Sequence, residues 1–83
     1  MEEENQVRIG FYCETLLADN QFNELVQILE SKLALEMLQA KTAEEREQHH
    51  RTYSGLKDLL ALMQQFVINK DQIALKAEEE ENK

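Results

Sequence analysis

The stretch that decides the fold of this 83-residue chain reads HHRTYSGLKDLLALMQQFVINKDQI, from His49 to Ile73. Its apolar residues recur at steps of three and four, the spacing that keeps side chains on one face of an α-helix. They form two such rows, and a helix with two apolar rows needs a second covering surface besides its nearest neighbour. The first row is His49, Tyr53, Leu56, Leu60, Met63 and Val67, and the second row is Leu59, Leu62, Phe66 and Ile73.

The rest of the chain also predicts helices. It contains no proline and only two glycines, and the three-four periodicity continues outside the quoted stretch. Asp19 and Asn20 interrupt the pattern with side chains that cap helices. Thr42 and Glu45 form the T-x-x-E capping box that marks the start of a new helix. We expect a single domain over residues 1–83, with helices over about residues 4–18, 21–40 and 43–69 or longer, and an acidic tail over residues 78–83.

The turn between the second and third helices is short, so these helices must lie antiparallel. The predicted fold class is therefore all-α: a long antiparallel helical hairpin with a short N-terminal helix packed against it. Gly55 inside the third helix costs about 1 kcal/mol relative to alanine. We expect it to permit the close approach of a neighbouring helix. The expected facing pairs of the hairpin are Met37–His49, Leu33–Tyr53, Leu29–Leu56 and Val26–Leu60.

More apolar surface is predicted than one short helix can cover. The second helix adds apolar residues that point away from its hairpin partner, and the N-terminal helix has an apolar face of its own to bury. Monomeric soluble proteins rarely expose large contiguous apolar patches. We therefore predict a homo-oligomer, most simply a two-fold dimer that forms a helical bundle. The predicted interaction surface is Ile28, Leu35, Leu38, Leu59, Leu62, Phe66 and Ile73.

The net charge of −8 is concentrated at the two ends of the chain. The clusters Glu2–Glu4 and Glu78–Glu81 account for all but one unit of it, and such acidic ends favour solubility. Nucleic acid is not a favoured partner, because its binding requires a basic excess. Cys13 is the only cysteine, which excludes an internal disulfide, and we expect it to be a small buried side chain in a reducing compartment. No signal peptide or membrane span is recognisable.

A metal-binding half-bundle is a remote alternative. Glu47 and His50 have the Glu-x-x-His spacing of ferritin-like di-iron sites, and Glu36 lies across the hairpin at a similar height. However, Glu47 and His50 are rotated by about 160° and 100° from the row that contains His49. A carboxylate that faces solvent cannot bind a metal inside the helical bundle, so we predict no metal site and no cofactor.

Two other polar features have plain interpretations. One is a strip of basic and aromatic residues of the kind that binds phosphate, which on an acidic chain we interpret as a solvated helix edge. The other is His49, which follows Glu45 by four residues and is expected to be half-exposed beside a carboxylate. No nucleophile with its base, glycine-rich phosphate loop or zinc set is present, so the chain is predicted not to be an enzyme. The basic strip is Arg46, His50, Tyr53 and Lys57.

Most of the chain resembles short, acidic, all-helical proteins encoded by tailed bacteriophages in the head and DNA-packaging gene region. These proteins are mostly uncharacterised, so the resemblance implies no catalytic or binding residue. It implies a phage or prophage origin, a place in the bacterial cytoplasm or in the virion, and assembly with copies of itself or with a virion or host protein. The residues that carry it are Arg8–Gly10, Leu16–Phe22, Thr42–Glu47, Tyr53, Leu56 and Leu59.

These observations predict a non-enzymatic, phage-type helical assembly or adaptor protein that acts through homo-oligomerisation and protein–protein contacts. The alternative is a small regulatory protein that inhibits a host or packaging protein by presenting its acidic ends to a basic partner.

Overall fold

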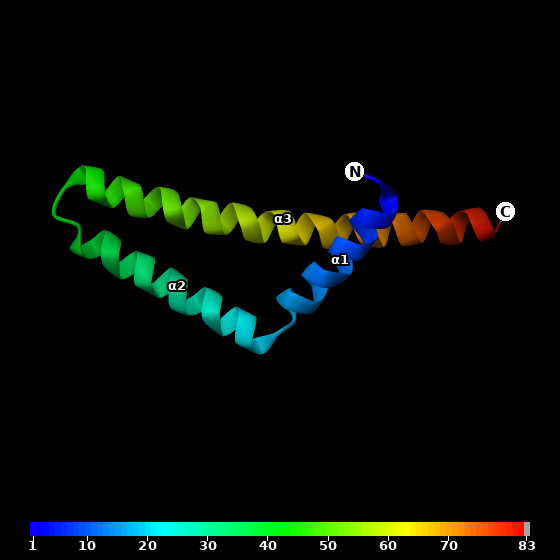
Figure 1. Cartoon of the computed structure of the whole chain (residues 1–83), viewed down its shortest axis with the longest axis horizontal. Helices are drawn as coiled ribbons and strands as arrows, with labels where there is room; N and C mark the ends of the chain where they lie inside the picture. The colour runs from blue at the N-terminus through cyan, green and yellow to red at the C-terminus, as the bar shows by residue number, and fades with distance from the viewer. Residues whose placement is uncertain (83) are drawn as a thin grey trace. The chain divides into compact units, whose positions relative to one another are not determined.

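The computed structural model describes residues 1–82 and confirms the all-α fold class. Three helices follow one another along the chain, and no strand is present among these residues (Figure 1). The first two helices begin and end within two residues of their expected bounds. Their ranges are α1, Glu3–Leu17, and α2, Asn20–Gln39; the third helix is α3, Ala43–Glu81.

The two long helices begin at the side chains that the sequence indicates. At the start of α2, Asp19 Oδ1 accepts a hydrogen bond from the backbone N–H of Phe22, at 2.8 Å. At the start of α3, Thr42 Oγ1 accepts from the N–H of Glu45, and the Glu45 carboxylate accepts from the N–H of Lys41, each at 3.1 Å. These bonds satisfy backbone donors that have no partner inside the helix.

Helix α3 has 39 residues, which agrees with the expected range of 43–69 or longer. It continues through Glu78–Glu81, which we had expected to form a separate tail. No proline or glycine follows Gly55, and the residues after Asp71 are mostly good helix formers, so nothing local ends the helix. Lys83, the last residue of the expected tail, lies outside the described residues.

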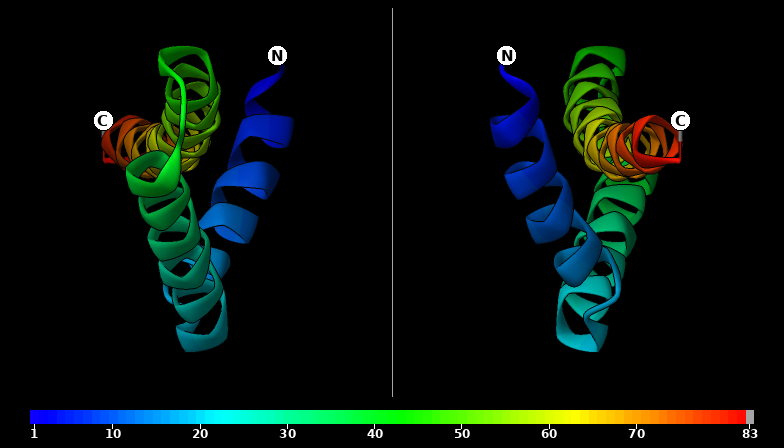
Figure 2. Two further views of the ribbon diagram at one scale, coloured as in Figure 1. Left: turned by 90° about the vertical axis from the view of Figure 1, so that its left-hand side faces the viewer. Right: turned by 90° about the vertical axis from the view of Figure 1, so that its right-hand side faces the viewer.

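The chain divides into two compact units that share α3. The hairpin unit is Asp19–Leu60, which contains α2 and the first half of α3. The terminal unit is Met1–Ala18 together with the part of α3 from Ala61 onward, and it contains α1. Figure 2 views α3 almost along its length, as one unbroken helix that contributes to both units.

In the hairpin unit, the two helices are antiparallel with the expected register. Glu36 faces His49 and Glu30 faces Lys57, each within one residue of an expected pair. Leu33 is the most deeply buried residue of this unit, with 4% of its surface exposed. The helices diverge away from the turn (Figure 1), and Leu29, expected at the centre of the interface, keeps 36% of its surface exposed.

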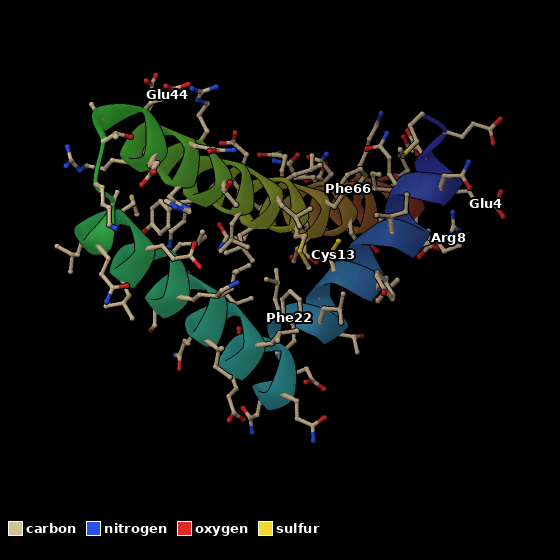
Figure 3. All side chains as sticks on the ribbon, turned by 60° about the vertical axis from the view of Figure 1, so that its left-hand side comes forward. Glu4, Arg8, Cys13, Phe22, Glu44 and Phe66 are labelled. Carbon is tan, nitrogen blue, oxygen red and sulfur yellow. The ribbon has the colours of Figure 1, made fainter. Side chains whose placement is uncertain are left out.

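In the terminal unit, α1 packs against the second half of α3 through a close backbone approach. A Cβ atom placed on Gly10 would lie 2.6 Å from Lys70 Cβ and 2.7 Å from the Phe66 carbonyl oxygen. Cys13, one turn further along α1, is buried as expected, and so is Met63 of α3. Figure 3 shows the opposite side of α1, from which Glu4 and Arg8 extend away from α3.

The expected role of Gly55 is wrong, because no atom lies within 4 Å of the position its Cβ would occupy. The close approach that we assigned to Gly55 occurs at Gly10. The reason is geometric: Gly55 is exposed on an open side of α3, whereas Gly10 is buried where α1 meets α3.

Candidate interaction surface

Five of the seven residues in the predicted interaction surface are exposed. Ile28, Leu35 and Leu38 of α2 and Leu59 and Leu62 of α3 each have more than half of their surface accessible. The remaining two, Phe66 and Ile73, are half-buried. The second apolar row of α3 is therefore divided between a covered part and an open part.

The covered part of this row lies where α1 packs. Gly10 of α1 approaches the backbone of Phe66, and a shallow depression on the same unit is lined by Gln6 of α1 and Ile73 of α3, among others. The fifteen-residue α1 covers this segment and leaves Leu62, one turn before Phe66, open. The short N-terminal helix thus covers the part of the row that contains Phe66 and Ile73. As expected, it does not cover the whole row.

The outer face of α2 carries four exposed apolar side chains. Leu25 is 63% exposed, Ile28 58%, Leu35 54% and Leu38 84%. They lie on the side of α2 that is turned away from Leu33, its buried residue, by the ordinary rotation of about 100° per residue. We call these four residues the outer face of α2.

Several other exposed apolar residues lie outside the predicted interaction surface. Leu25 precedes Ile28 by three residues, so the same spacing rule could have included it in the outer face. Ile68 and Leu75 of α3 stand seven residues apart and are exposed on another side of that helix. Phe11 and Tyr12 of α1 are exposed as well.

Lys70 is a charged residue whose role the sequence analysis did not identify. Although charged, it is buried in the terminal unit, where its Nζ lies 2.7 Å from Asp71 Oδ1 and 2.8 Å from Glu14 Oε2. The same Nζ lies 4.6 Å from the centre of the Phe11 ring, a cation–π geometry. Hydrogen bonds to Asp71 and then Glu14 raise the pKa of Lys70. Its position seven residues after Met63, on the same helical face, was the available signal.

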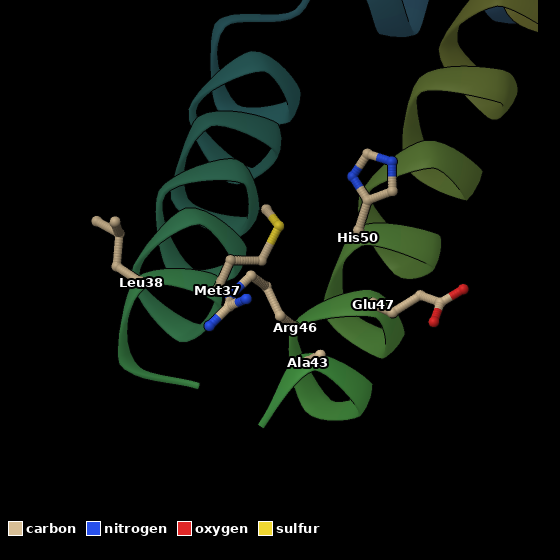
Figure 4. A pocket seen from close by; sticks show the side chains of 6 residues that line it. All are labelled: Met37, Leu38, Ala43, Arg46, Glu47 and His50. Carbon is tan, nitrogen blue, oxygen red and sulfur yellow. The ribbon is translucent and has the colours of Figure 1, made fainter. Parts of the chain in front are cut away.

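A shallow pocket of about 640 Å³ opens at the turn of the hairpin unit (Figure 4). In this view Arg46 extends from α3 toward α2, whereas the carboxylate of Glu47 points away from α2. The lining is mixed and holds no buried polar group that is aimed into the space. The lining residues are Met37, Leu38, Ala43, Arg46, Glu47 and His50.

The residues of the metal-binding alternative are not brought together. Glu36 Oε2 lies 3.0 Å from the Nδ1 of His49, an ion pair when the imidazole is protonated. Each of these two side chains is about one-third exposed, so His49 is half-exposed beside a carboxylate, and that carboxylate is Glu36 rather than Glu45. Within residues 1–82, no three histidine, cysteine or acidic side chains cluster in a way that could hold a metal ion.

The basic strip on α3 is partly committed to contacts within the hairpin unit. Lys57 Nζ lies 3.3 Å from Glu30 Oε1 and 5.5 Å from the centre of the Tyr53 ring. The hydrogen bond to Glu30 is the main reason that the pKa of Lys57 is raised. A cation already paired with a carboxylate is a weak phosphate ligand, so the strip is best interpreted as a helix edge.

Among residues 1–82, none of the helices combines the length and the apolar character that a membrane crossing requires. Comparison of the chain with protein-family models, with curated proteins and with solved structures finds no match. The exposed apolar side chains are thus the feature of the structure that bears on function.

Proposed function

We propose that this protein is a non-enzymatic helical assembly or adaptor protein, which acts by binding copies of itself and other proteins. The observation that supports the proposal is the accumulation of exposed apolar side chains on both long helices. Burying apolar surface is the main driving force of protein association. Six such residues are Leu25, Ile28, Leu35 and Leu38 of α2, and Leu59 and Leu62 of α3.

The amount of exposed apolar surface also supports the proposal. Single exposed leucines are ordinary on soluble proteins, but large contiguous patches mark interaction sites. On α2 the exposed residues follow one another at steps of three and seven along one face, and on α3 Leu59 and Leu62 are three apart. Each group therefore lies along one face of its helix rather than scattered around it.

The resemblance to helical proteins of tailed bacteriophages extends the proposal to a second kind of partner. In that setting the protein would act in the bacterial cytoplasm or in the virion, and a virion or host protein would bind beside the second copy. Self-association is the part of the proposal that the purified protein can test directly.

Sedimentation equilibrium over a range from low to high micromolar concentration provides the test. We expect the mass of the wild type to rise with concentration toward that of a dimer. The double variant Leu35→Glu/Leu62→Glu places a charge in each exposed group and should remain a monomer with unchanged helical circular dichroism. Phe66→Glu is less suitable, because Phe66 is half-buried where α1 packs and its substitution would disturb the terminal unit.

A matched control is Ile68→Glu/Leu75→Glu, which adds the same two charges at exposed apolar positions outside the predicted surface. This variant should associate like the wild type. A wild-type protein that stays monomeric at high micromolar concentration would overturn the proposal.

A further inference from the structure

The four residues of the outer face of α2 have a symmetric arrangement along the helix. Leu25 and Leu38 are equally distant from the midpoint between Ser31 and Lys32, and so are Ile28 and Leu35. All four are more than half exposed. The fifth exposed apolar residue of α2, Leu29, is the least exposed and belongs to the edge of the hairpin interface.

Such symmetry is what an antiparallel pair of identical helices requires. In a two-fold contact the same surface is used by both copies, so a residue before the axis meets the residue equally far beyond it. With the axis between Ser31 and Lys32, Ile28 would meet Leu35 of the second copy, and Leu25 would meet its Leu38. A parallel pair matches every residue with itself and needs no symmetry in the sequence.

The angular positions agree with this pairing. Ile28 and Leu35 are seven residues apart and therefore share one line along the helix to within about 20°. Leu25 and Leu38 lie about 60° to opposite sides of that line, at the usual rotation of 100° per residue. In an antiparallel pair, two residues at the same height along the two helices lie on opposite sides of this line. Leu25 of one copy and Leu38 of the other would therefore lie side by side in one layer of the contact.

The residues beside the axis also permit a close contact. Ser31 is small, so it leaves room for the opposing helix. Lys32 is the only charge between Ile28 and Leu35 on this face, and its Nζ lies 3.6 Å from Glu36 of the same helix. Glu30 is bound by Lys57 at 3.3 Å.

The charges of the outer face are mixed: Lys32 is paired with Glu36 of the same helix, whereas Glu24, one residue before Leu25, is exposed on it. The symmetric spacing of the four apolar residues, which a second copy matches, is the argument for a second copy as the occupant of the face.

We propose that two copies of this protein pair through the outer faces of α2, antiparallel and with the two-fold axis between Ser31 and Lys32. This inference rests on the proposed self-association and names its contact. A contact one helix wide and 20 residues long covers roughly 30 Å by 10 Å. That is about 300 Å² on each copy, below the size of standard specific interfaces, so the contact describes a weak and reversible dimer.

Thiol cross-linking tests the orientation and the register. Ser31→Cys places a thiol beside the axis, within disulfide distance of its copy. Leu38→Cys places thiols that are about 20 Å apart in the dimer, since the two positions are separated by thirteen residues at 1.5 Å each. We expect Ser31→Cys to form a covalent dimer on mild oxidation. Leu38→Cys alone should not, whereas Ile28→Cys and Leu35→Cys, which the pairing places opposite each other near the central line, should cross-link when the two variants are mixed.

The wild type, with only the buried Cys13, is the control for cross-linking that does not depend on α2. Cross-linking of Leu38→Cys with itself would show a parallel pair and overturn the inference. Absence of cross-linking at Ser31→Cys in a protein that associates by sedimentation would also overturn it, while leaving the proposed function intact. A wild-type protein that does not associate would overturn both the proposed self-association and this contact.

Leu35→Glu and Leu75→Glu supply an independent measurement with the same substitution at two similarly exposed leucines. Leu35→Glu should raise the dissociation constant of the dimer by about tenfold or more, equivalent to about 1.4 kcal/mol or more. Leu75→Glu should leave the dissociation constant within about twofold of the wild type. Equal effects of the two substitutions would argue for non-specific apolar association and against this contact.

Discussion

The two compact units of this protein hold their helices together in different ways. In the terminal unit the backbones approach so closely at Gly10 that a methyl group would collide with α3. In the hairpin unit Gly55 faces open space, and long side chains such as Glu30 and Lys57 bridge the helices. The same residue type in the middle of a helix therefore has opposite consequences in the two units. The effect of a glycine inside a helix on packing can therefore be judged only when the helix that packs beside it is known.

The buried residues differ as well. Within residues 1–82, four residues are buried in the terminal unit, among them the charged Lys70, whereas the hairpin unit has only Leu33. The hairpin unit should thus depend on one side chain, and the terminal unit on close packing over several.

The largest expected effect is on the hairpin unit. Leu33→Ala truncates its most deeply buried side chain and should lower the free energy of unfolding by about 2–5 kcal/mol, as large-to-small changes in packed interiors do. Urea denaturation measures this loss. Leu75→Ala, at an exposed leucine outside the outer face of α2, is the control and should change stability by less than about 0.5 kcal/mol. Similar losses for both variants would contradict the assignment of Leu33 as the centre of the unit.

The next effect concerns the close approach in the terminal unit. Gly10→Ala adds a methyl group that meets Lys70 Cβ and the Phe66 carbonyl oxygen, neither of which can move without its backbone. Overpacking of this kind costs about 1–3 kcal/mol, and the better helix propensity of alanine offsets part of it. We expect a net loss of roughly 1–2 kcal/mol in urea denaturation. A gain in stability would show that α1 and α3 are further apart than this contact implies.

The matched substitution in the hairpin unit should act in the opposite direction. Gly55→Ala meets no atom within 4 Å and only reduces the conformational freedom of the unfolded chain. We expect a gain of about 0.5–1 kcal/mol, measured in the same way as for Gly10→Ala. If both glycine variants lose stability, a neighbour lies close to Gly55 and the contrast between the units does not hold.

The smallest effect compares the two paired lysines, one in each unit. The pKa of Lys70 and that of Lys57 are both raised by hydrogen bonds to carboxylates. A raised pKa in the folded state gives stability that is complete below the ordinary value of 10.5 and is lost as the pH rises through the folded-state pKa. We therefore expect the urea midpoint of the wild type to fall above pH 10.5.

Single methionine variants separate the two lysines. Lys70→Met and Lys57→Met should each reduce this fall in the urea midpoint, Lys70→Met by more because its ammonium binds two carboxylates. Identical pH profiles for Lys70→Met and the wild type would mean that the buried ammonium does not contribute to stability.

Much of the fold could be predicted from local patterns. Asp19 and the Thr42–Glu45 box cap the long helices as expected, because capping depends on residues within one turn. The antiparallel register also agrees at the two polar contacts Glu36–His49 and Glu30–Lys57, since a short turn leaves little choice of register. The end of α3 was less predictable: a run of glutamates is compatible with either a helix or a tail, and the structure continues the helix to Glu81.

The candidate surface was predicted in part. Ile28, Leu35 and Leu38 are exposed because they lie opposite the hairpin interface, a consequence of helical periodicity alone. The exposure of Leu62 and the partial burial of Phe66 could not be predicted, because both belong to one row and only the position of α1 distinguishes them.

The positions of the helices, their starting residues and the antiparallel hairpin can all be predicted from the sequence, because each depends on residues close together in the chain. Three features follow only from the packing of α1 against α3: the close contact at Gly10, the part of α3 that α1 covers, and the burial of Lys70. These features depend on residues about 60 positions apart, such as Gly10 and Lys70. Their contact is set by the fit of two helix surfaces, and helical periodicity restricts that fit without selecting one solution.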